Sequence, residues 1–376
     1  MKVIFFANTD WYLYNFRFSL ANALRDKGIE VVLLSPGGEY AKRLREAGFC
    51  WREIPLSKGK VNLFADIVSL IQLWNLYRKE NPAIVHHYTI KCVVYGSCAA
   101  HLAGIKTIVN SVTGLGFIFT DNGQVRRILR SMILLAYRIV LRNTRIIFQN
   151  PTDRDLFLSM KLATPDSVEL IRGSGVDIDL FQPREEPQGV PVVLFPGRFL
   201  RDKGISEFVE SARIVNNNGA KARFILAGDL YEGNPSSISA RELQSWTNEG
   251  VVECWGWSGQ MQNIYPLANI VCLPSYREGL SRTLIEACAC GRAVVTTDVP
   301  GCRDVVKHGE NGLLVPPKDP QALAKAILEL IKSPGTRRQM ALAGRKIAER
   351  DFSTEKIIQE TLDVYRKLGL SSFEIK

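Results

Sequence analysis

Two short segments in the second half of the chain carry side chains that could hold a phosphorylated ligand. The first reads GRFLRDKG over residues 197–204, between an apolar run and a helical pattern. Gly197 and Gly204 permit close backbone approach. Arg198 and Lys203 can converge on one anion, because cations bind phosphate oxygens strongly. The segment does not have the P-loop spacing G-x-x-x-x-G-K-[ST]. Taken alone, it is equally compatible with a solvated basic turn.

The second segment reads EGLSRTLIE over residues 278–286 and follows an apolar run and a turn. Ser281 is a plausible helix N-cap, and the free N–H groups from Gly279 to Thr283 would favour an anion. Glu278 would stand in the preceding loop and Glu286 one turn inside the helix. Carboxylates in such positions accept hydrogen bonds from sugar and ribose hydroxyls. The alternative is ordinary acidic residues that are favoured by the helix dipole. Together, the two segments supply what a nucleotide diphosphate sugar needs.

Alternating strands and helices must position these segments. Repeated β-α-β order favours parallel sheets covered on both faces, so we expect two doubly wound α/β domains joined near residues 176–189. Ligands in such sheets bind at the carboxyl ends of the strands. After the first strand we expect a loop and then a helix from about residue 16 to 27. The expected strands are 3–7, 31–35, 83–87, 107–111, 146–149 and 168–171, then 191–196, 222–227, 251–254, 270–273, 293–296 and 312–315.

Composition excludes several classes of protein. Apolar residues make up 46% and charged residues 23% of the 376 residues, as in a soluble globular protein of about two domains. No C-x-x-C pair occurs, which argues against a zinc ribbon or a thioredoxin-type site. No run of about 18 apolar residues and no signal-peptide core is present, so we expect a cytoplasmic protein. The net charge of +10 suits an anionic partner, but no nucleic-acid module is recognisable.

Four motifs in the same order resemble those of a known family. Glu278 and Glu286 match the E-x7-E motif of retaining glycosyltransferases of family 4, which have the GT-B fold, and residues 197–204 match its G-R-x-x-x-x-K-G segment. Residues 175–183 resemble its G-V-D-x-x-x-F-x-P segment, and residues 311–315 its N-G-L-L-V segment. The resemblance implies two Rossmann-like domains that face each other across a cleft. The N-terminal domain would span residues 1–185 and the C-terminal domain residues 186–352, and a helix in 353–376 would pack back on the N-terminal domain.

The family resemblance also implies roles for these residues. Arg198 and Lys203 would bind the diphosphate of the donor, and Glu278 and Glu286 would contact the donor sugar and the ribose. The backbone near Gly279, Leu280 and Ser281 would hold the distal phosphate, and the base would dock near Trp255 and Gly256. The family requires neither a metal nor another cofactor, and the UDP-sugar is a co-substrate. Two D-x-D segments, at residues 153–155 and 177–179, are interpreted as chance matches to the metal motif of another transferase fold.

Loops of the first half are expected to form the acceptor side. They offer Tyr14, Arg17, His87, Thr113, Gly114 and Gly116 at the ends of predicted strands. His86 and His87 would point to opposite faces of a strand, so a catalytic histidine and a purely structural pair both stay open. The Gly-Leu-Gly loop at 114–116 resembles bacterial transferases that extend sugars linked to undecaprenyl diphosphate. One such relative adds N-acetylgalactosamine to diacetylbacillosamine on that lipid.

A basic segment extends from Gln124 to Arg145 and contains no acidic residue. On a helix, five of its six arginines fall on one half of the circumference, and most apolar residues, Met132 and Ile139 among them, fall on the other. Such a helix suits an anionic membrane surface, which would place the protein on the inner face of the cell membrane. The alternative is a core helix with a cationic outer face.

The expected reaction is transfer of a hexose or N-acetylhexosamine from a UDP-sugar to a lipid-linked or growing saccharide, with retention of configuration. The family resemblance implies front-face attack, in which the leaving diphosphate takes the acceptor proton. Two alternatives remain open: a UDP-sugar 2-epimerase of the same fold, and a non-catalytic sugar-nucleotide binder.

Overall fold

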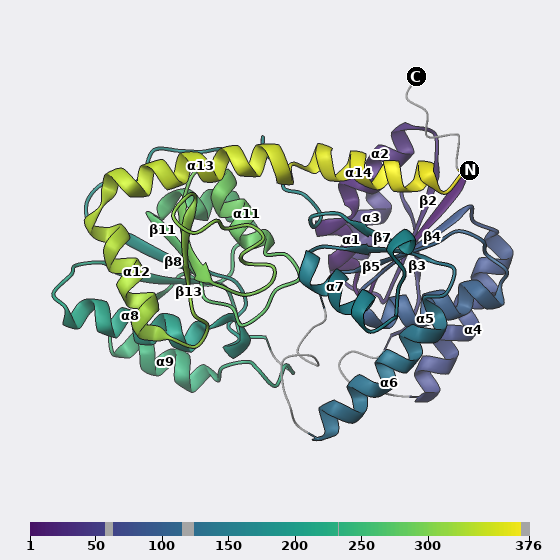
Figure 1. Ribbon diagram of the computed structural model, residues 1–376, viewed down its shortest axis with the longest axis horizontal. Helices are drawn as coiled ribbons and strands as arrows, with labels where there is room; N and C mark the ends of the chain where they lie inside the picture. The colour runs from purple at the N-terminus through teal and green to yellow at the C-terminus, as the bar shows by residue number, and fades with distance from the viewer. Residues whose placement is uncertain (57–62, 115–123, 232, 370–376) are drawn as a thin grey trace. The chain divides into compact units, whose positions relative to one another are not determined.

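The computed structural model describes residues 1–56, 63–114, 124–231 and 233–369 (Figure 1). The chain forms two compact units. The first contains residues 1–174 together with 355–376, and the second contains residues 175–354. Each unit is built on its own parallel sheet, and each is described by itself.

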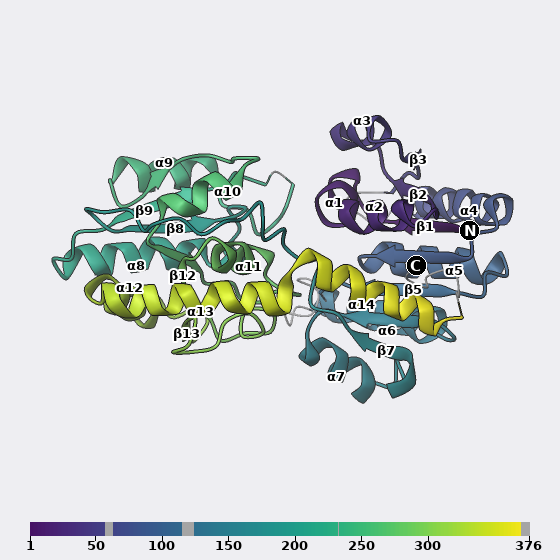
Figure 2. The ribbon, with the colours of Figure 1, turned by 90° about the horizontal axis from the view of Figure 1, so that it is seen from above.

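The first unit has a seven-stranded parallel sheet in the order β3-β2-β1-β4-β5-β6-β7. Figure 2 labels β3, β2, β1, β5 and β7 of this sheet in that order from top to bottom. Every residue of β4 and β5 is buried, as expected for central strands with helices on both faces. The strands are β1 (Lys2–Phe6), β2 (Glu30–Ser35), β3 (Cys50–Glu53), β4 (Ile84–Tyr88), β5 (Ile108–Val112), β6 (Arg145–Phe148) and β7 (Val168–Leu170).

Eight helices of the described chain accompany this sheet. They are α1 (Asp10–Phe16), α2 (Phe18–Asp26), α3 (Glu39–Glu46), α4 (Leu63–Glu80), α5 (Ile90–Leu102), α6 (Gln124–Val140), α7 (Pro151–Ser159) and α14 (Thr354–Lys367). The last of these returns to the first unit, where Ile357, Leu362 and Tyr365 join the same core cluster as Phe5 and Tyr88.

The loop expected after the first strand is wrong, because residues 10–16 form helix α1. Thr9 caps this helix by accepting a hydrogen bond from the Tyr12 N–H at 3.0 Å, and Asp10 stands in its first turn. Helix α2 then begins at Phe18. Arg17 therefore lies at the junction of two helices.

The second unit has a six-stranded parallel sheet in the order β10-β9-β8-β11-β12-β13. The strands are β8 (Val192–Pro196), β9 (Arg223–Ala227), β10 (Glu253–Cys254), β11 (Ile270–Leu273), β12 (Ala293–Thr297) and β13 (Gly312–Val315). Helices of the described chain in this unit are α8 (Ile205–Asn217), α9 (Ala240–Asn248), α10 (Met261–Ile264), α11 (Arg282–Ala289), α12 (Pro320–Lys332) and α13 (Pro334–Phe352).

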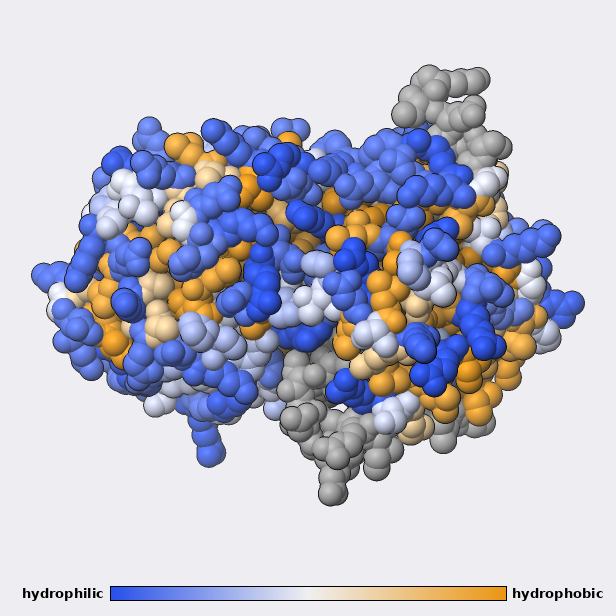
Figure 3. Space-filling view, in the orientation of Figure 1, coloured by the Kyte–Doolittle hydropathy of each residue, from blue (hydrophilic) through white to orange (hydrophobic). Residues whose placement is uncertain are grey.

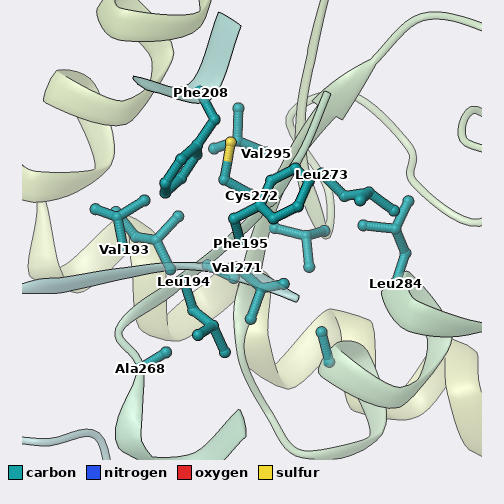
Figure 4. Close-up of a cluster of buried hydrophobic side chains, with 14 of the residues drawn as sticks. Val193, Leu194, Phe195, Phe208, Ala268, Val271, Cys272, Leu273, Leu284 and Val295 are labelled. Atoms are coloured by element: carbon teal, nitrogen blue, oxygen red, sulfur yellow. The ribbon is translucent and has the colours of Figure 1, made fainter. Parts of the chain in front are cut away.

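One core cluster stabilises the second unit. Figure 4 shows part of it, with Phe195 of β8 and Phe208 of α8 beside Cys272 and Val295 of the neighbouring strands, and the two phenyl rings lie 5.4 Å apart. Strands β8 and β12 are fully buried along their length. This core fixes the strand ends from which the two motif segments emerge.

Helix α6 departs from the expected division into two faces. Tyr137, Val140 and Leu141 are buried, but Met132, Leu135 and Ile139 are each more than 60% exposed, on the same side as the exposed Arg138. The side chains of residues 124–129 lie outside the described residues. Within the described chain, no helix is both long and apolar enough to cross a membrane.

Candidate functional site

The two motif segments of the second unit meet at the carboxyl ends of neighbouring strands. Strands β8 and β11 pair directly, and Lys203 Nζ contacts Glu278 Oε1 at 2.5 Å. Ser275 donates its hydroxyl hydrogen bond to the same oxygen at 2.6 Å. Both side chains are accessible, with 22% of Lys203 and 12% of Glu278 exposed. The structure therefore brings the predicted cation and the predicted carboxylate together at the edge where ligands bind in such sheets.

Gly204 makes this approach possible. It has φ of +75°, and a Cβ atom there would lie 2.1 Å from the Pro274 carbonyl oxygen. A side chain would push the two loops apart and would also strain the backbone. This is the physical reason for a glycine directly after Lys203.

A third loop, which the sequence reasoning missed, supports the Glu278 segment. The Glu278 N–H donates to the Pro300 carbonyl at 3.1 Å, and the Ser281 N–H donates to the Gly301 carbonyl at 3.0 Å. Gly301 has φ of +79°, and its absent Cβ leaves room for the backbone of Glu278. The Pro-Gly pair that follows β12 was the available sign. The expectation that the Ser281 N–H is free is wrong, because Gly301 occupies it.

Glu286 has its own set of partners. Tyr265 donates its hydroxyl to Glu286 Oε2 at 3.0 Å, and Arg282 Nε donates to Oε1 at 2.7 Å. Burial, together with the neighbouring carboxylate, raises the pKa of Tyr265 well above 10, so the phenol stays protonated and remains a donor. Among the described residues, Glu278 and Glu286 make no contact with each other. Tyr265 was not identified from the sequence.

Arg198 lies at the same edge of the sheet but is exposed. Its guanidinium stands over the ring of Tyr231, 4.8 Å from the centroid. Gly197 donates its N–H to the Ala227 carbonyl at 2.9 Å, and Gly228 approaches so closely that a Cβ there would overlap the Gly197 carbonyl. The backbone next to Arg198 is thus fixed. Among the described residues, the side chain is held by a cation–π contact that a ligand could replace.

Trp255 and Gly256 follow β10, and the Trp255 N–H donates to the Leu226 carbonyl at 2.9 Å. Trp255 also lines a cavity of about 500 Å³ that includes Val192 and Arg223. These are the first residues of β8 and β9, at the opposite edge of the sheet from Lys203. This cavity is therefore separate from the site of the two motif segments.

In the first unit, the residues predicted to contact the acceptor lie in different surroundings. Tyr14 packs against Phe18 and Tyr40 at centroid distances of 5.3 and 5.2 Å. Thr113 and Gly114 directly follow β5, and Gly114 has φ of +127°. Arg17 is 6% exposed and donates to the Tyr12 hydroxyl at 2.8 Å. Gly116 lies outside the described residues.

The predicted contact of His87 with an acceptor is corrected by the structure. The ring is fully buried, with Nδ1 2.9 Å from Asn110 Oδ1 and Nε2 3.1 Å from the Tyr77 hydroxyl. Gly96 lies against its other side. Burial lowers the pKa of His87 to about 4. A histidine whose ring nitrogens both have internal partners holds the sheet together and cannot reach a ligand.

Neither D-x-D segment gathers metal ligands. Asp177 Oδ1 accepts hydrogen bonds from the N–H groups of Asp179 and Leu180, and Asp153 is buried against Asn150. Among the described residues, no group of three His, Cys, Asp or Glu side chains could hold a metal ion.

Comparison with known proteins agrees with this architecture. The model described as "Glycosyl transferase 4-like" matches residues 2–150, and the model described as "Glycosyl transferases group 1" matches residues 177–347. Two parallel α/β units of this kind define the GT-B class, and the chain belongs to family 4 of the GT-B glycosyltransferases.

Solved structures with the same fold include a glycosyltransferase from Rickettsia africae, with a TM-score of 0.80 and 18% identity over 98% of each chain. HepE from Anabaena, in complex with UDP and glucose, also has a TM-score of 0.80, with 19% identity over 97% of this chain and 99% of HepE. At such identities the likeness concerns the fold alone.

Among curated relatives, a Campylobacter jejuni protein is 27% identical over 91% of this chain and 92% of its own length. It is named N,N'-diacetylbacillosaminyl-diphospho-undecaprenol alpha-1,3-N-acetylgalactosaminyltransferase. The capsular polysaccharide biosynthesis glycosyltransferase CapM of Staphylococcus aureus is 28% identical over 91% of both chains. An Escherichia coli alpha-1,3-galactosyltransferase that is named for UDP-galactose and a diphosphoundecaprenol acceptor is 25% identical over 74% of this chain and 73% of its own length.

Proposed function

We propose that this glycosyltransferase moves a hexose or N-acetylhexosamine from a UDP-sugar to a saccharide carried on a lipid diphosphate, with retention of configuration and without a metal. The observation that carries the proposal is the contact of Lys203 with Glu278 at the carboxyl edge of the second sheet. The UDP complexes of HepE support the choice of donor. The names of the C. jejuni and E. coli relatives support the choice of acceptor.

Charge on the leaving diphosphate is the quantity that this site must stabilise. An ammonium group has three N–H donors, and Glu278 occupies one on Lys203, so the others can bind phosphate oxygens. Arg198 can leave Tyr231 and add a bidentate contact. The first turn of α11, which begins at Arg282, adds the positive end of a helix dipole. These groups act as a clamp where a metal ion would otherwise neutralise the charge.

Glu278 then has two tasks in this proposal. In the unliganded protein it holds Lys203 in place, together with Ser275. When the diphosphate takes over part of Lys203, the carboxylate is free to accept a hydrogen bond from a donor-sugar hydroxyl. In front-face attack the leaving phosphate oxygen receives the acceptor proton, so no protein base is required. Glu286, which is fixed by Arg282 and Tyr265, would accept a hydrogen bond from the ribose.

The proposal includes an anionic membrane surface as the place of the reaction. The exposed side chains of Met132, Leu135 and Ile139 follow one another at i, i+3 and i+7 on α6, and Leu102 at the end of α5 is 64% exposed. Exposed Arg138 and Arg142 accompany them. In Figure 3, orange and dark-blue residues adjoin in the lower part of the first unit, where Figure 1 places α4, α5 and α6. Apolar side chains beside arginines suit insertion at the headgroups of anionic lipids.

The test is a reaction of the purified chain with a panel of UDP-sugars and short-chain polyprenyl-diphosphate saccharides, in the presence of EDTA. We expect one donor to give a product that is larger by one sugar, with the anomeric configuration of the donor in its proton NMR spectrum. Release of a free sugar epimer from the donor alone, an inverted linkage, or full dependence on a divalent metal would each contradict the corresponding part of the proposal.

A further inference from the structure

Arg17 is a buried cation without an opposite charge. Its side chain is 6% exposed, and its described contacts are with tyrosines: a hydrogen bond from Nη2 to the Tyr12 hydroxyl at 2.8 Å, and cation–π contacts to the rings of Tyr88 at 4.2 Å and Tyr12 at 5.4 Å. No described acidic residue forms an ion pair with it. A buried guanidinium without a carboxylate is unfavourable, because it loses hydration and gains no compensating charge.

One nitrogen on the phosphate-binding edge of this guanidinium, Nε, has no partner in the described chain. Nε and Nη2 form the side-on edge of an arginine, and this edge donates two parallel hydrogen bonds to two oxygens of one anion. In Arg17, Nε is buried and makes no hydrogen bond within the described chain, and Nη2 donates only to a neutral phenol. The tyrosine rings hold the guanidinium in place without satisfying this edge.

A second feature lies next to the same tyrosine. Thr89, which follows Tyr88 at the carboxyl end of β4, has φ of +73° and is the N-cap of helix α5. A β-branched residue with positive φ is strained, and such strain is concentrated at binding sites. Within the described chain no side chain caps the 13-residue helix, so its positive end is available at this edge of the sheet.

The side chains that act electrostatically on Arg17 are those of Tyr12, Tyr88 and Tyr365, and no described acidic residue is among them. His86 is stacked on Tyr88 at 4.2 Å and is held by Tyr365 at 2.6 Å and by Ser111 at 2.7 Å. Burial and the charge of Arg17 keep the pKa of His86 well below 6.5, so this ring is neutral. The surroundings are thus neutral hydrogen-bonding groups around one positive charge.

We propose that the Nε–Nη2 edge of Arg17 binds a phosphate group of the acceptor diphosphate, so that the first unit carries a diphosphate site of its own. The identification of the ligand as the acceptor rests on the proposed function. The existence of an anion site does not, because it is argued from the buried cation, its unpaired Nε and the strained start of α5. Arg17 would then fix the acceptor by its lipid-linked end and leave the sugar hydroxyl free to react.

The kinetic test compares two acceptors that carry the same saccharide, one on a short polyprenyl diphosphate and one on a neutral alkyl chain. For Arg17→Gln, we expect kcat/KM with the diphosphate acceptor to fall about tenfold or more, and kcat/KM with the neutral acceptor to stay within about twofold. Arg17→Lys keeps the charge but has no side-on edge. With the diphosphate acceptor, its kcat/KM should lie between those of the wild type and Arg17→Gln. Equal losses with both acceptors would show a merely structural role and overturn the proposal, as would unchanged rates with both.

A binding test separates this inference from the proposed function. The probe is inorganic pyrophosphate, titrated against an Arg198→Ala/Lys203→Ala protein so that neither cation of the donor clamp contributes. We expect pyrophosphate to raise the thermal midpoint of this double variant but not that of the Arg17→Gln/Arg198→Ala/Lys203→Ala triple variant. This result would support the anion site even if no transferase activity were found. The absence of any shift in the double variant, or equal shifts in both proteins, would overturn it.

Discussion

The two sheets differ in how charged side chains are compensated at their carboxyl edges. In the second unit, Lys203 and Glu278 neutralise each other and are both partly exposed. In the first unit, Arg17 is buried without a counter-charge, the neighbouring histidines are buried and neutral, and apolar side chains of α6 stand on the surface. A paired, accessible edge suits a water-soluble ligand that binds and leaves. A unit that has both a buried cation and an apolar surface suits a ligand with an anionic group and a lipid tail.

The paired edge depends on Gly204, and its replacement should have the largest effect on stability. Gly204→Ala combines positive φ with overlap of the Pro274 carbonyl, so we expect a loss of about 2–5 kcal/mol in the free energy of unfolding. The matched control is Gly219→Ala, which has nearly the same φ of +74° but open space around its Cβ. The control should lose only about 1–2 kcal/mol in urea unfolding. Equal losses would show that the loop approach at Lys203 is not tight.

Removal of the Lys203–Glu278 ion pair should have the next largest effect, and this effect concerns the rate of transfer. Lys203→Ala removes a charge-assisted contact worth roughly 1.5–3 kcal/mol, so kcat/KM for the donor should fall about tenfold to a hundredfold. The thermal midpoint should change less than the rate, because Glu278 keeps the hydrogen bond from the Ser275 hydroxyl when Lys203 is removed. Lys203→Arg is the control that keeps the charge and should recover part of the rate. Unchanged turnover in Lys203→Ala would remove Lys203 from the donor site.

Sequence reasoning worked better for the paired edge than for the buried one. Both motif segments are predicted at the carboxyl ends of strands, which is where they lie. The pairing of β8 with β11, and with it the contact of Lys203 with Glu278, comes from the structure. The pairing of Glu286 with Tyr265 joins residues 21 positions apart through the fold, so no local pattern reports it. The hydrogen bond from the Ser281 N–H to the Gly301 carbonyl likewise joins residues that only the fold brings together.

In the first unit, the periodicity of apolar residues in the sequence does not predict which side chains are buried. The alternation of apolar and polar residues predicts which face of β4 a side chain takes, but not whether that face is covered. Both faces are covered here, so His86 and His87 are both enclosed. On α6, the period of the helix predicts a stripe, but only packing against the neighbouring elements decides that Tyr137 is buried and that Leu135 is exposed.

The buried histidines of the first unit should appear as an acid sensitivity. His87 has a pKa of about 4 in the folded state and about 6.5 when unfolded, so between these values only the unfolded chain takes up a proton. Stability from this group is complete above pH 6.5, falls as the pH falls toward 4, and does not fall further below that. Between pH 7 and pH 5 the loss should be about 2 kcal/mol. We expect urea titrations of His87→Gln to show a weaker pH dependence than the wild type. An identical dependence would mean that the pKa of His87 is the same in the folded and the unfolded chain.

The apolar surface of the first unit should give the smallest effect. Leu135 on α6 is 61% exposed, and Leu342 on α13 of the second unit is 66% exposed, so the two are matched in type and exposure. If α6 inserts at an anionic membrane, Leu135→Ser should weaken co-sedimentation with phosphatidylglycerol vesicles about three- to tenfold, in line with the loss of roughly 1 kcal/mol of partial apolar burial. Leu342→Ser should leave it unchanged, because nothing assigns α13 to the lipid. Equal effects of the two variants would show that vesicle binding depends on general hydrophobicity and not on α6. The first unit would then have no assigned membrane surface to distinguish it from the second.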